Sequence, residues 1–190
     1  MSMHLSAETP IKTVSRQAAA LALAACLLSL LLAACGGSDS TPDGFKVYED
    51  TEGRFSVLYP ENWDVLQEPG TIVSFAEPQA EGVDRAYANV NAEAMEEPVN
   101  PAEYMDRVLP LMEEMLPEFQ LLSSEEVTVN GVDGVRVNYS FSLQEENMTL
   151  LTYALVKDEH IYAFSGGAMT DRYQELEATF DTMFRNAKIN

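Results

Sequence analysis

Four segments with the apolar pattern of strands follow one another with only turn-forming residues between them. Of all the features of the sequence, this succession most restricts the folds that the chain can adopt. They cover residues 121–129, 134–143, 148–157 and 160–166. Asn130-Gly131 is a hairpin signal, but the apolar pattern resumes only at Gly134, which predicts a loop longer than two residues. Residues 144–147 and Asp158-Glu159 make the other turns. Short connections join antiparallel neighbours, so this part of the chain predicts a strand meander.

Five shorter segments before the meander also have the character of strands. They cover residues 46–49, 54–59, 64–67, 72–76 and 86–92, with proline, glycine and acidic turn residues between them. In the second segment Phe55, Val57 and Tyr59 fall on one face of the strand, which marks that face as buried. Pro60 lacks an amide hydrogen and is therefore expected to end the strand.

The first predicted helix begins after Asn100, which is placed to cap it, with Pro101 at the first helical position and Glu103 at the third. Pro117 ends the helix, and Pro110 inside it predicts a kink or a break. Six apolar residues recur at helical spacing and predict a stripe packed against the core: Tyr104, Met105, Val108, Met112, Met115 and Leu116.

The second predicted helix covers residues 171–186, with Thr170 as its expected cap. Its apolar stripe consists of Tyr173, Leu176, Phe180, Met183 and Phe184. Antiparallel strands with two separate helices indicate the α+β class, an antiparallel β-sheet flanked by helices. Trp63 follows Pro60 closely, and a single Trp in a small domain is expected to fill the core.

Three stretches of this sequence resemble the PsbP-like domain: FSVLYPENW, VNGVDGVRVNYS and the closing YALVKDEHIYAFSGGAMTDRYQELEATFDTMFRNAKI. This domain occurs in the photosystem protein PsbP and in bacterial lipoproteins of the DcrB and LpqN type. The resemblance spans most of residues 45–189. It implies a PsbP-like α/β/α sandwich, and accessory or binding roles more often than catalysis. It transfers no functional residue to a position of this chain.

The N-terminal segment has the features of a bacterial lipoprotein signal peptide. Lys12 and Arg16 precede an apolar run over residues 18–34, which falls short of the roughly 20 residues of a spanning helix. Leu32-Ala33-Ala34-Cys35 resembles the lipobox, in which signal peptidase II cuts before a lipid-modified cysteine. We therefore predict cleavage between Ala34 and Cys35 and lipid attachment to Cys35. A secretory signal without lipidation is the alternative.

A second lipobox-like sequence, Leu23-Ala24-Ala25-Cys26, competes with the first. Cleavage before Cys26 leaves a leucine-rich mature terminus, whereas cleavage before Cys35 uses the whole apolar run and exposes a polar tether of Gly, Ser and Asp. We favour Cys35. The predicted organisation is a signal peptide over residues 1–34, the lipidated cysteine and its tether over 35–44, and the PsbP-like domain over 45–190.

The charge of the chain limits its partners. The sequence has 31 acidic and 11 basic residues, for a net charge of −20. Without residues 1–34, which contain Glu8, Lys12 and Arg16, it has 30 acidic and 9 basic residues and a net charge of −21. This charge disfavours nucleic acid as a partner. Beyond Cys35 there is no cysteine, which excludes an intradomain disulfide and a thiolate metal site.

No residue pattern indicates catalysis, a metal or a cofactor. His160 is the only histidine after residue 34, and we expect it to be a solvated turn residue. The acidic run Glu49-Asp50-Thr51-Glu52 is likewise expected to be a solvated turn, and Glu96-Glu97 also follows no calcium-loop pattern. Glu125 and Glu126 are neighbours on a strand and so point to opposite faces, which excludes a catalytic dyad.

These observations predict a lipid-anchored cell-envelope protein with a non-catalytic binding or accessory role and an envelope protein as partner. The domain is expected on the periplasmic or extracellular side of the cell membrane or the outer membrane. Two alternatives stay open: a carrier of a small ligand or cation, and, less favoured, an envelope hydrolase. A broad apolar surface patch favours the accessory role, and a deep pocket with convergent carboxylates and His160 favours the alternatives.

Overall fold

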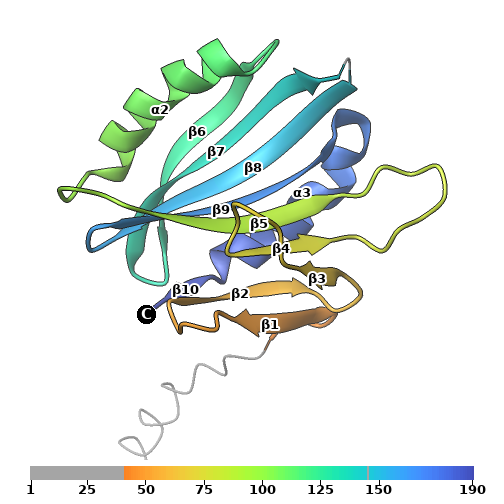
Figure 1. Ribbon diagram of the computed structural model, residues 1–190, viewed down its shortest axis with the longest axis horizontal. Helices are drawn as coiled ribbons and strands as arrows, with labels where there is room; N and C mark the ends of the chain where they lie inside the picture. Colours follow the sequence, from red (N-terminus) through yellow and green to blue (C-terminus); the bar gives the residue numbers. More distant parts are fainter. Residues whose placement is uncertain (1–40, 145) are drawn as a thin grey trace, which may run out of the picture. The chain divides into compact units, whose positions relative to one another are not determined.

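The computed structural model describes residues 41–144 and 146–190 (Figure 1). Its strands and helices, in chain order, are β1 (Phe45–Glu49), β2 (Phe55–Pro60), β3 (Asp64–Leu66), β4 (Val73–Ala76), β5 (Tyr87–Ala94), α2 (Pro101–Met115), β6 (Gln120–Val129), β7 (Val132–Leu143), β8 (Glu146–Lys157), β9 (His160–Met169), α3 (Thr170–Arg185) and β10 (Lys188–Ile189). The α+β class is confirmed.

The strands form two antiparallel sheets. The larger has seven strands in the order β3-β4-β5-β9-β8-β7-β6, and it contains the predicted meander as β6 to β9. The smaller has the order β1-β2-β10. The sequence did not predict β10, which has only two residues and pairs Lys188 with Ser56 and Ile189 with Phe55. Lys188 and Ile189 therefore lie beside β2, the second strand of the domain.

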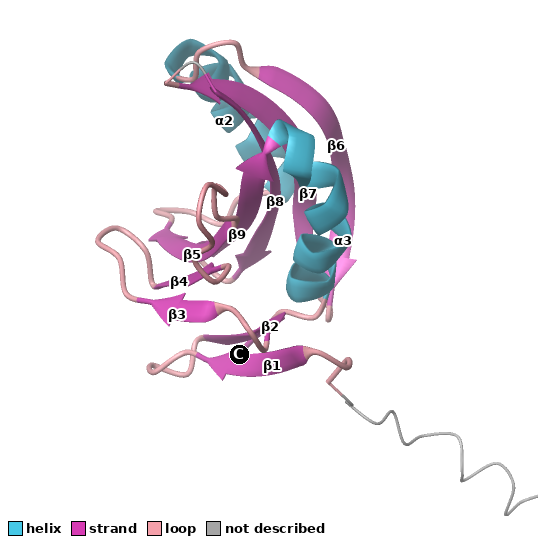
Figure 2. Ribbon diagram, turned by 90° about the vertical axis from the view of Figure 1, so that its right-hand side faces the viewer, coloured by secondary structure: helices cyan, strands magenta, loops and turns pink. Residues whose placement is uncertain are grey.

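The two helices cover opposite faces of the large sheet, as an α/β/α sandwich requires. Figure 2 shows the sheet bending between α2 and α3. Along β8, Leu151, Tyr153 and Leu155 belong to the core beneath α3, which the small sheet also covers. The intervening residue Ala154 belongs to a second core beneath α2, with Val135, Val137 and Ile161. Both cores depend on the alternation of side chains along the same strands.

The connection between β6 and β7 corrects the sequence prediction of a longer loop. Val129 pairs with Val132, so the turn consists of Asn130 and Gly131 alone, with φ of +49° and +83°. Both residues lie in the left-handed region that a two-residue hairpin of this type requires. Gly134 belongs to β7, where an added Cβ would lie 2.4 Å from the Ala154 carbonyl oxygen. Glycine is needed there for close strand approach and marks no turn.

Helix α2 begins as predicted and continues past Pro110, where a kink or a break was predicted. The Asn100 side chain accepts hydrogen bonds from the backbone N–H groups of Ala102 and Glu103. The helix then passes Pro110 without a break. Both Pro110 and Asp106, whose carbonyl loses its partner, are exposed residues, so water can replace the missing bond. The predicted stripe is wrong for Met115, which is 78% exposed.

Helix α3 follows β9 directly and has no side-chain cap. Thr170 was predicted as its cap but is its first residue, and its hydroxyl shares a 2.9 Å hydrogen bond with the hydroxyl of Thr149. The apolar stripe predicted for this helix is confirmed, because Tyr173, Phe180, Met183 and Phe184 are buried and Leu176 packs against the same core. Trp63 is buried as expected and meets Phe180 edge to face at 6.0 Å.

The close packing of α3 on β9 makes Gly166 a sensitive position. An added Cβ would lie 2.3 Å from a ring carbon of Phe180, which is fully buried. We expect Gly166→Ala to destabilise the protein by about 1–3 kcal/mol through overpacking. Urea unfolding of the variant measures the loss.

The matched control for Gly166→Ala is the double variant with Phe180→Leu, which removes the ring. The two changes should be non-additive, with the double variant more stable than the sum of the single losses predicts. Additive losses would show that the contact with Phe180 is not the cause.

Candidate functional site

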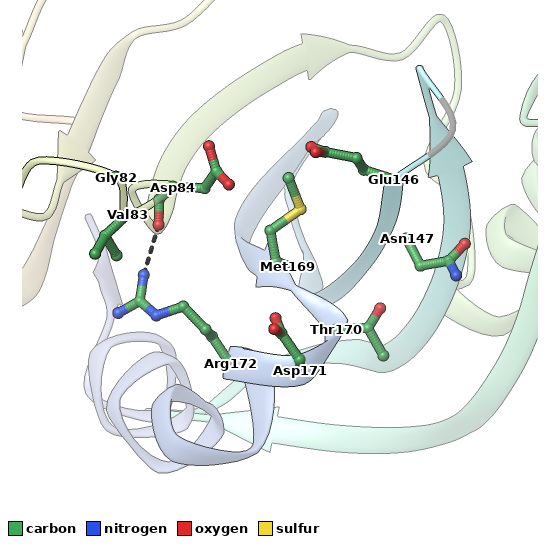
Figure 3. Close-up of a pocket in the computed structure, with 9 residues that line it drawn as sticks. All are labelled: Gly82, Val83, Asp84, Glu146, Asn147, Met169, Thr170, Asp171 and Arg172. Carbon is green, nitrogen blue, oxygen red and sulfur yellow. Dashed lines mark hydrogen bonds between the residues drawn. The ribbon is translucent and has the colours of Figure 1, made fainter.

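The main candidate site is a pocket of about 610 Å³ at one end of the large sheet (Figure 3). Three separate segments line it: the β4–β5 loop, the start of β8, and the junction of β9 with α3. The lining residues are Gly82, Val83, Asp84, Glu146, Asn147, Met169, Thr170, Asp171 and Arg172. Figure 3 shows the carboxylates of Asp84 and Glu146 directed toward one another across the pocket, with Met169 between them.

Arg172 fastens the β4–β5 loop to the start of α3. Its guanidinium donates to both carboxylate oxygens of Glu77, at 2.9 and 3.1 Å, and to the carbonyl oxygen of Asp84. Glu77 also accepts from the backbone N–H of Ala86 at 3.0 Å, and its own carbonyl accepts from Arg85 at 2.6 Å. The loop wall of the pocket is therefore held by a compact set of charge-assisted hydrogen bonds.

We call the hydrogen bonds from Arg172 to Glu77 and to the carbonyl of Asp84 the latch. The electrostatics of the latch favour an ionised Glu77. Partial burial opposes ionisation and would raise the pKa of Glu77, but the hydrogen bonds from Arg172 and Ala86 and the charge of Arg172 outweigh it. The net result is a pKa of Glu77 below its usual range. The Arg172 guanidinium is thus committed to Glu77 and the loop and is not aimed at the pocket interior.

The remaining pocket wall is acidic and exposed. Asp84, Glu146 and Asp171 are all exposed residues, and Asn147 accepts a 2.8 Å hydrogen bond from the Ser142 hydroxyl. Across residues 41–144 and 146–190, no three His, Cys, Asp or Glu side chains are grouped so that they could hold a metal ion. The pocket offers acceptor oxygens to a polar or cationic ligand, but it holds neither histidine nor cysteine to serve as a base or thiol nucleophile.

The residues singled out in the sequence lie away from this pocket. His160 is an exposed residue at the start of β9, beside a separate shallow cleft with Pro98, Asp158 and Glu159. The expectation of a solvated residue is confirmed. Ala34, Cys35 and the competing Cys26 lie outside the described residues, so the predicted cleavage and lipid attachment stay predictions.

The acidic run at residues 49–52 is not uniformly solvated as predicted. Asp50 is 5% exposed and pairs with Arg54, whose Nε and Nη2 donate to its two oxygens at 2.6 and 2.9 Å. These hydrogen bonds outweigh burial and hold the pKa of Asp50 below its usual value. Asp50 is a structural partner of Arg54 in the turn before β2 and is not a cation ligand.

A second feature is an exposed apolar surface, here called the apolar corner. It consists of Leu111, Met115, Leu121, Leu122 and Leu143, with exposed fractions between 46% and 78%. The backbone N–H of Ser142 donates to the carbonyl of Pro117 at 2.8 Å, which brings the end of β7 to the connection between α2 and β6. Figure 1 shows these three ends together at the top of the view.

The comparisons with known proteins identify the family. The sequence matches the PsbP family over residues 43–188. This chain belongs to the PsbP family. The matched range covers all of the described strands and helices except the last residue of β10. Comparison with curated proteins finds no match.

Solved structures of low sequence identity share the fold. Cyanobacterial PsbP from Synechocystis sp. PCC 6803 has a TM-score of 0.57 at 16% identity, covering 83% of this chain and 98% of its own. LpqN of Mycobacterium tuberculosis, described as involved in cell envelope biogenesis, has a TM-score of 0.58 at 14% identity, covering 77% and 90%. The Saccharomyces cerevisiae Ran-binding protein Mog1p has 0.53 at 10% identity, covering 76% and 95%.

These likenesses confirm the PsbP-like fold that the sequence resemblance implied. At such identities they assign no pocket residue a role. Among the described residues, no helix has the length and apolar character needed to cross a membrane.

The latch between Arg172 and Glu77 predicts a pH-dependent effect on stability. Arg172→Gln should lower the free energy of unfolding by about 1–2 kcal/mol at pH 7, because it leaves the half-buried Glu77 carboxylate without its main partner. The contribution of ionised Glu77 is complete above its ordinary pKa of 4.5 and is lost as the pH falls through its lower folded-state pKa. The difference between wild type and variant should therefore shrink below pH 4.5.

Urea unfolding at a series of pH values measures this difference. Arg107→Gln is the matched control, because Arg107 is exposed and donates only to the Glu103 carbonyl of its own helix. It should change stability by less than about 0.5 kcal/mol at every pH. A wild-type advantage over Arg172→Gln that persists unchanged into acid would contradict the role given to Glu77.

Proposed function

We propose that this protein is a lipid-anchored cell-envelope protein with a non-catalytic binding or accessory role, exercised through its PsbP-like domain. Two observations together carry the proposal: the main pocket is lined by neither histidine nor cysteine, and the apolar corner is exposed. Soluble domains rarely leave such apolar clusters uncovered unless they contact another molecule. The corner therefore supports a protein partner.

Two further observations support a place in the envelope. The family match begins at residue 43, and the predicted tether of Gly, Ser and Asp ends at residue 44, so the lipobox-like Cys35 stands just outside the domain. In addition, LpqN, which shares the fold, is described as involved in cell envelope biogenesis. A lipid on Cys35 would keep the domain at the membrane surface with the PsbP-like domain free to bind.

The anchor is tested by replacing the cysteines one at a time in the full chain. Cys35→Ser should move the protein from the membrane fraction to the soluble fraction and remove the lipid mass from its N-terminal peptide, because the thiol that receives the lipid is gone. Cys26→Ser is the matched control and should leave both results unchanged. Membrane fractionation with mass spectrometry gives the readout. Release of the protein by Cys26→Ser instead would show that Cys26, and not Cys35, carries the lipid.

A second candidate function is a carrier of a small cationic ligand. It is favoured by the exposed carboxylates of Asp84, Glu146 and Asp171 around the pocket. Calcium titration of the full chain tests it by calorimetry and melting temperature. Because the pocket lacks a metal-type cluster, we expect no heat and no shift in melting temperature. A calcium-induced shift that Asp171→Asn abolishes would favour the carrier over the accessory role.

A further inference from the structure

The apolar corner lies on the α2 side of the large sheet and at the far end of the domain from β1. In Figures 1 and 2 the end of α2 and the start of β6 lie at one end of the view and β1 at the other. The corner is therefore far from the strand that opens the domain.

The corner is assembled from residues that the fold leaves outside both cores. Leu111 and Met115 are four residues apart on α2 and therefore share one face of the helix, while Met105 on another face is buried. Leu121 and Leu122 lie where β6 has a register irregularity at the free edge of the sheet. Leu143 is at the end of β7. Each is about half exposed or more.

The charged residues nearest the corner in sequence are mostly acidic. The exception on α2 is Arg107, an exposed residue one turn before Leu111, whose guanidinium donates to the carbonyl of Glu103 on its own helix. Between Val108 and Val156 the sequence has a single cation, Arg136. That cation is 12% exposed and pairs with Glu125, Glu177 and Asp181 beneath α3, on the opposite face of the sheet. The same stretch contains the carboxylates Glu113, Glu114, Glu118, Glu125, Glu126, Asp133, Glu145 and Glu146.

This arrangement selects among the occupants that an apolar surface can have. An anionic lipid surface is repelled by the carboxylates. A second copy of a chain with a net charge of −20 brings like charges together. An apolar segment flanked by lysine or arginine satisfies both the exposed leucines and the carboxylates around them.

We propose that the apolar corner binds an apolar segment of a protein partner that carries lysine or arginine beside its apolar residues. Leucine and methionine side chains of the corner contact the apolar residues of that segment. Glu113, Glu114 and Glu118 face its cations. The inference deepens the proposed accessory function by giving the chemistry of the partner, and it rests on that function.

The test uses a short synthetic amphipathic helix of leucine and lysine as the probe. The full chain, in nanodiscs of neutral phosphatidylcholine, is titrated by fluorescence anisotropy against the labelled peptide. We expect saturable binding that weakens as salt is added, because part of the attraction is between exposed charges. A peptide of the same composition in scrambled, non-amphipathic order should bind at least about tenfold more weakly, since charge alone does not fill the apolar corner.

Two variants locate the binding. Met115→Ser combined with Leu111→Ser should weaken binding by at least about tenfold without a loss of stability, because both side chains are exposed. Val65→Ser is the matched control, since Val65 is 42% exposed on β3 at the other edge of the sheet and should leave binding unchanged. Equal binding by the double variant overturns the proposal.

Three other results would also overturn it. These are equal affinity for the scrambled peptide, concentration-dependent dimers that the double variant abolishes, and binding of phosphatidylglycerol vesicles by the Cys35→Ser chain that the double variant abolishes. The peptide assay is repeated on Cys35→Ser in solution, where anchoring has no part. If Cys35→Ser leaves the protein in the membrane fraction while the peptide still binds, the membrane claim alone fails. If Cys35→Ser releases the protein as predicted but the chain does not bind the peptide, only the inference made here fails.

Discussion

The fold depends on the strict alternation of side chains along β7, β8 and β9. On β8 the odd-numbered residues Leu151, Tyr153 and Leu155 pack beneath α3, while Leu150, Ala154 and Val156 pack toward α2. A shift of one residue in the pairing of these strands would exchange the two sets and expose both cores. The tight Asn130-Gly131 turn and the close approach at Gly134 fix the register at one end of the meander. Both helices, and everything they position, depend on that register.

A polar network beneath α3 positions the first turn of this helix, which lines the pocket. Tyr153 donates a 2.6 Å hydrogen bond to Asp181, which also pairs with Arg136 and Arg185. Burial, and then the neighbouring carboxylate, raise the pKa of Tyr153, while the arginines and the tyrosine outweigh burial and lower the pKa of Asp181. Since α3 continues from β9 without a loop, pinning its second half also orients its first turn. That turn carries Thr170, Asp171 and Arg172 to the pocket.

Much of the fold was predictable because it follows from local patterns. The meander, the cap at Asn100 and the buried stripe of α3 each depend on residues close together in sequence. The errors arose where distant contacts decide. Gly134 reads as a turn residue, yet it is glycine because the carbonyl of Ala154 lies against it. Asp50 was predicted to be a solvated charge, yet its side chain is buried and pairs with Arg54. The pocket combines three segments that no local pattern joins, so the sequence did not predict it.

The apolar corner shows why a stripe at helical spacing does not distinguish core from interface. Five apolar positions on α2, and Leu116 directly after it, match the period of a helix, but the sheet beneath α2 buries only one side of it. Met105 lies on that side, and Met115 lies beyond it, where the chain turns into β6. An apolar stripe wider than the sheet beneath it leaves some of its residues exposed, and Arg107 is the only cation within α2 whose aliphatic stem could cover them. The exposed apolar residues at the end of α2, together with the carboxylates beside them, are therefore the part of the sequence that indicates a binding partner.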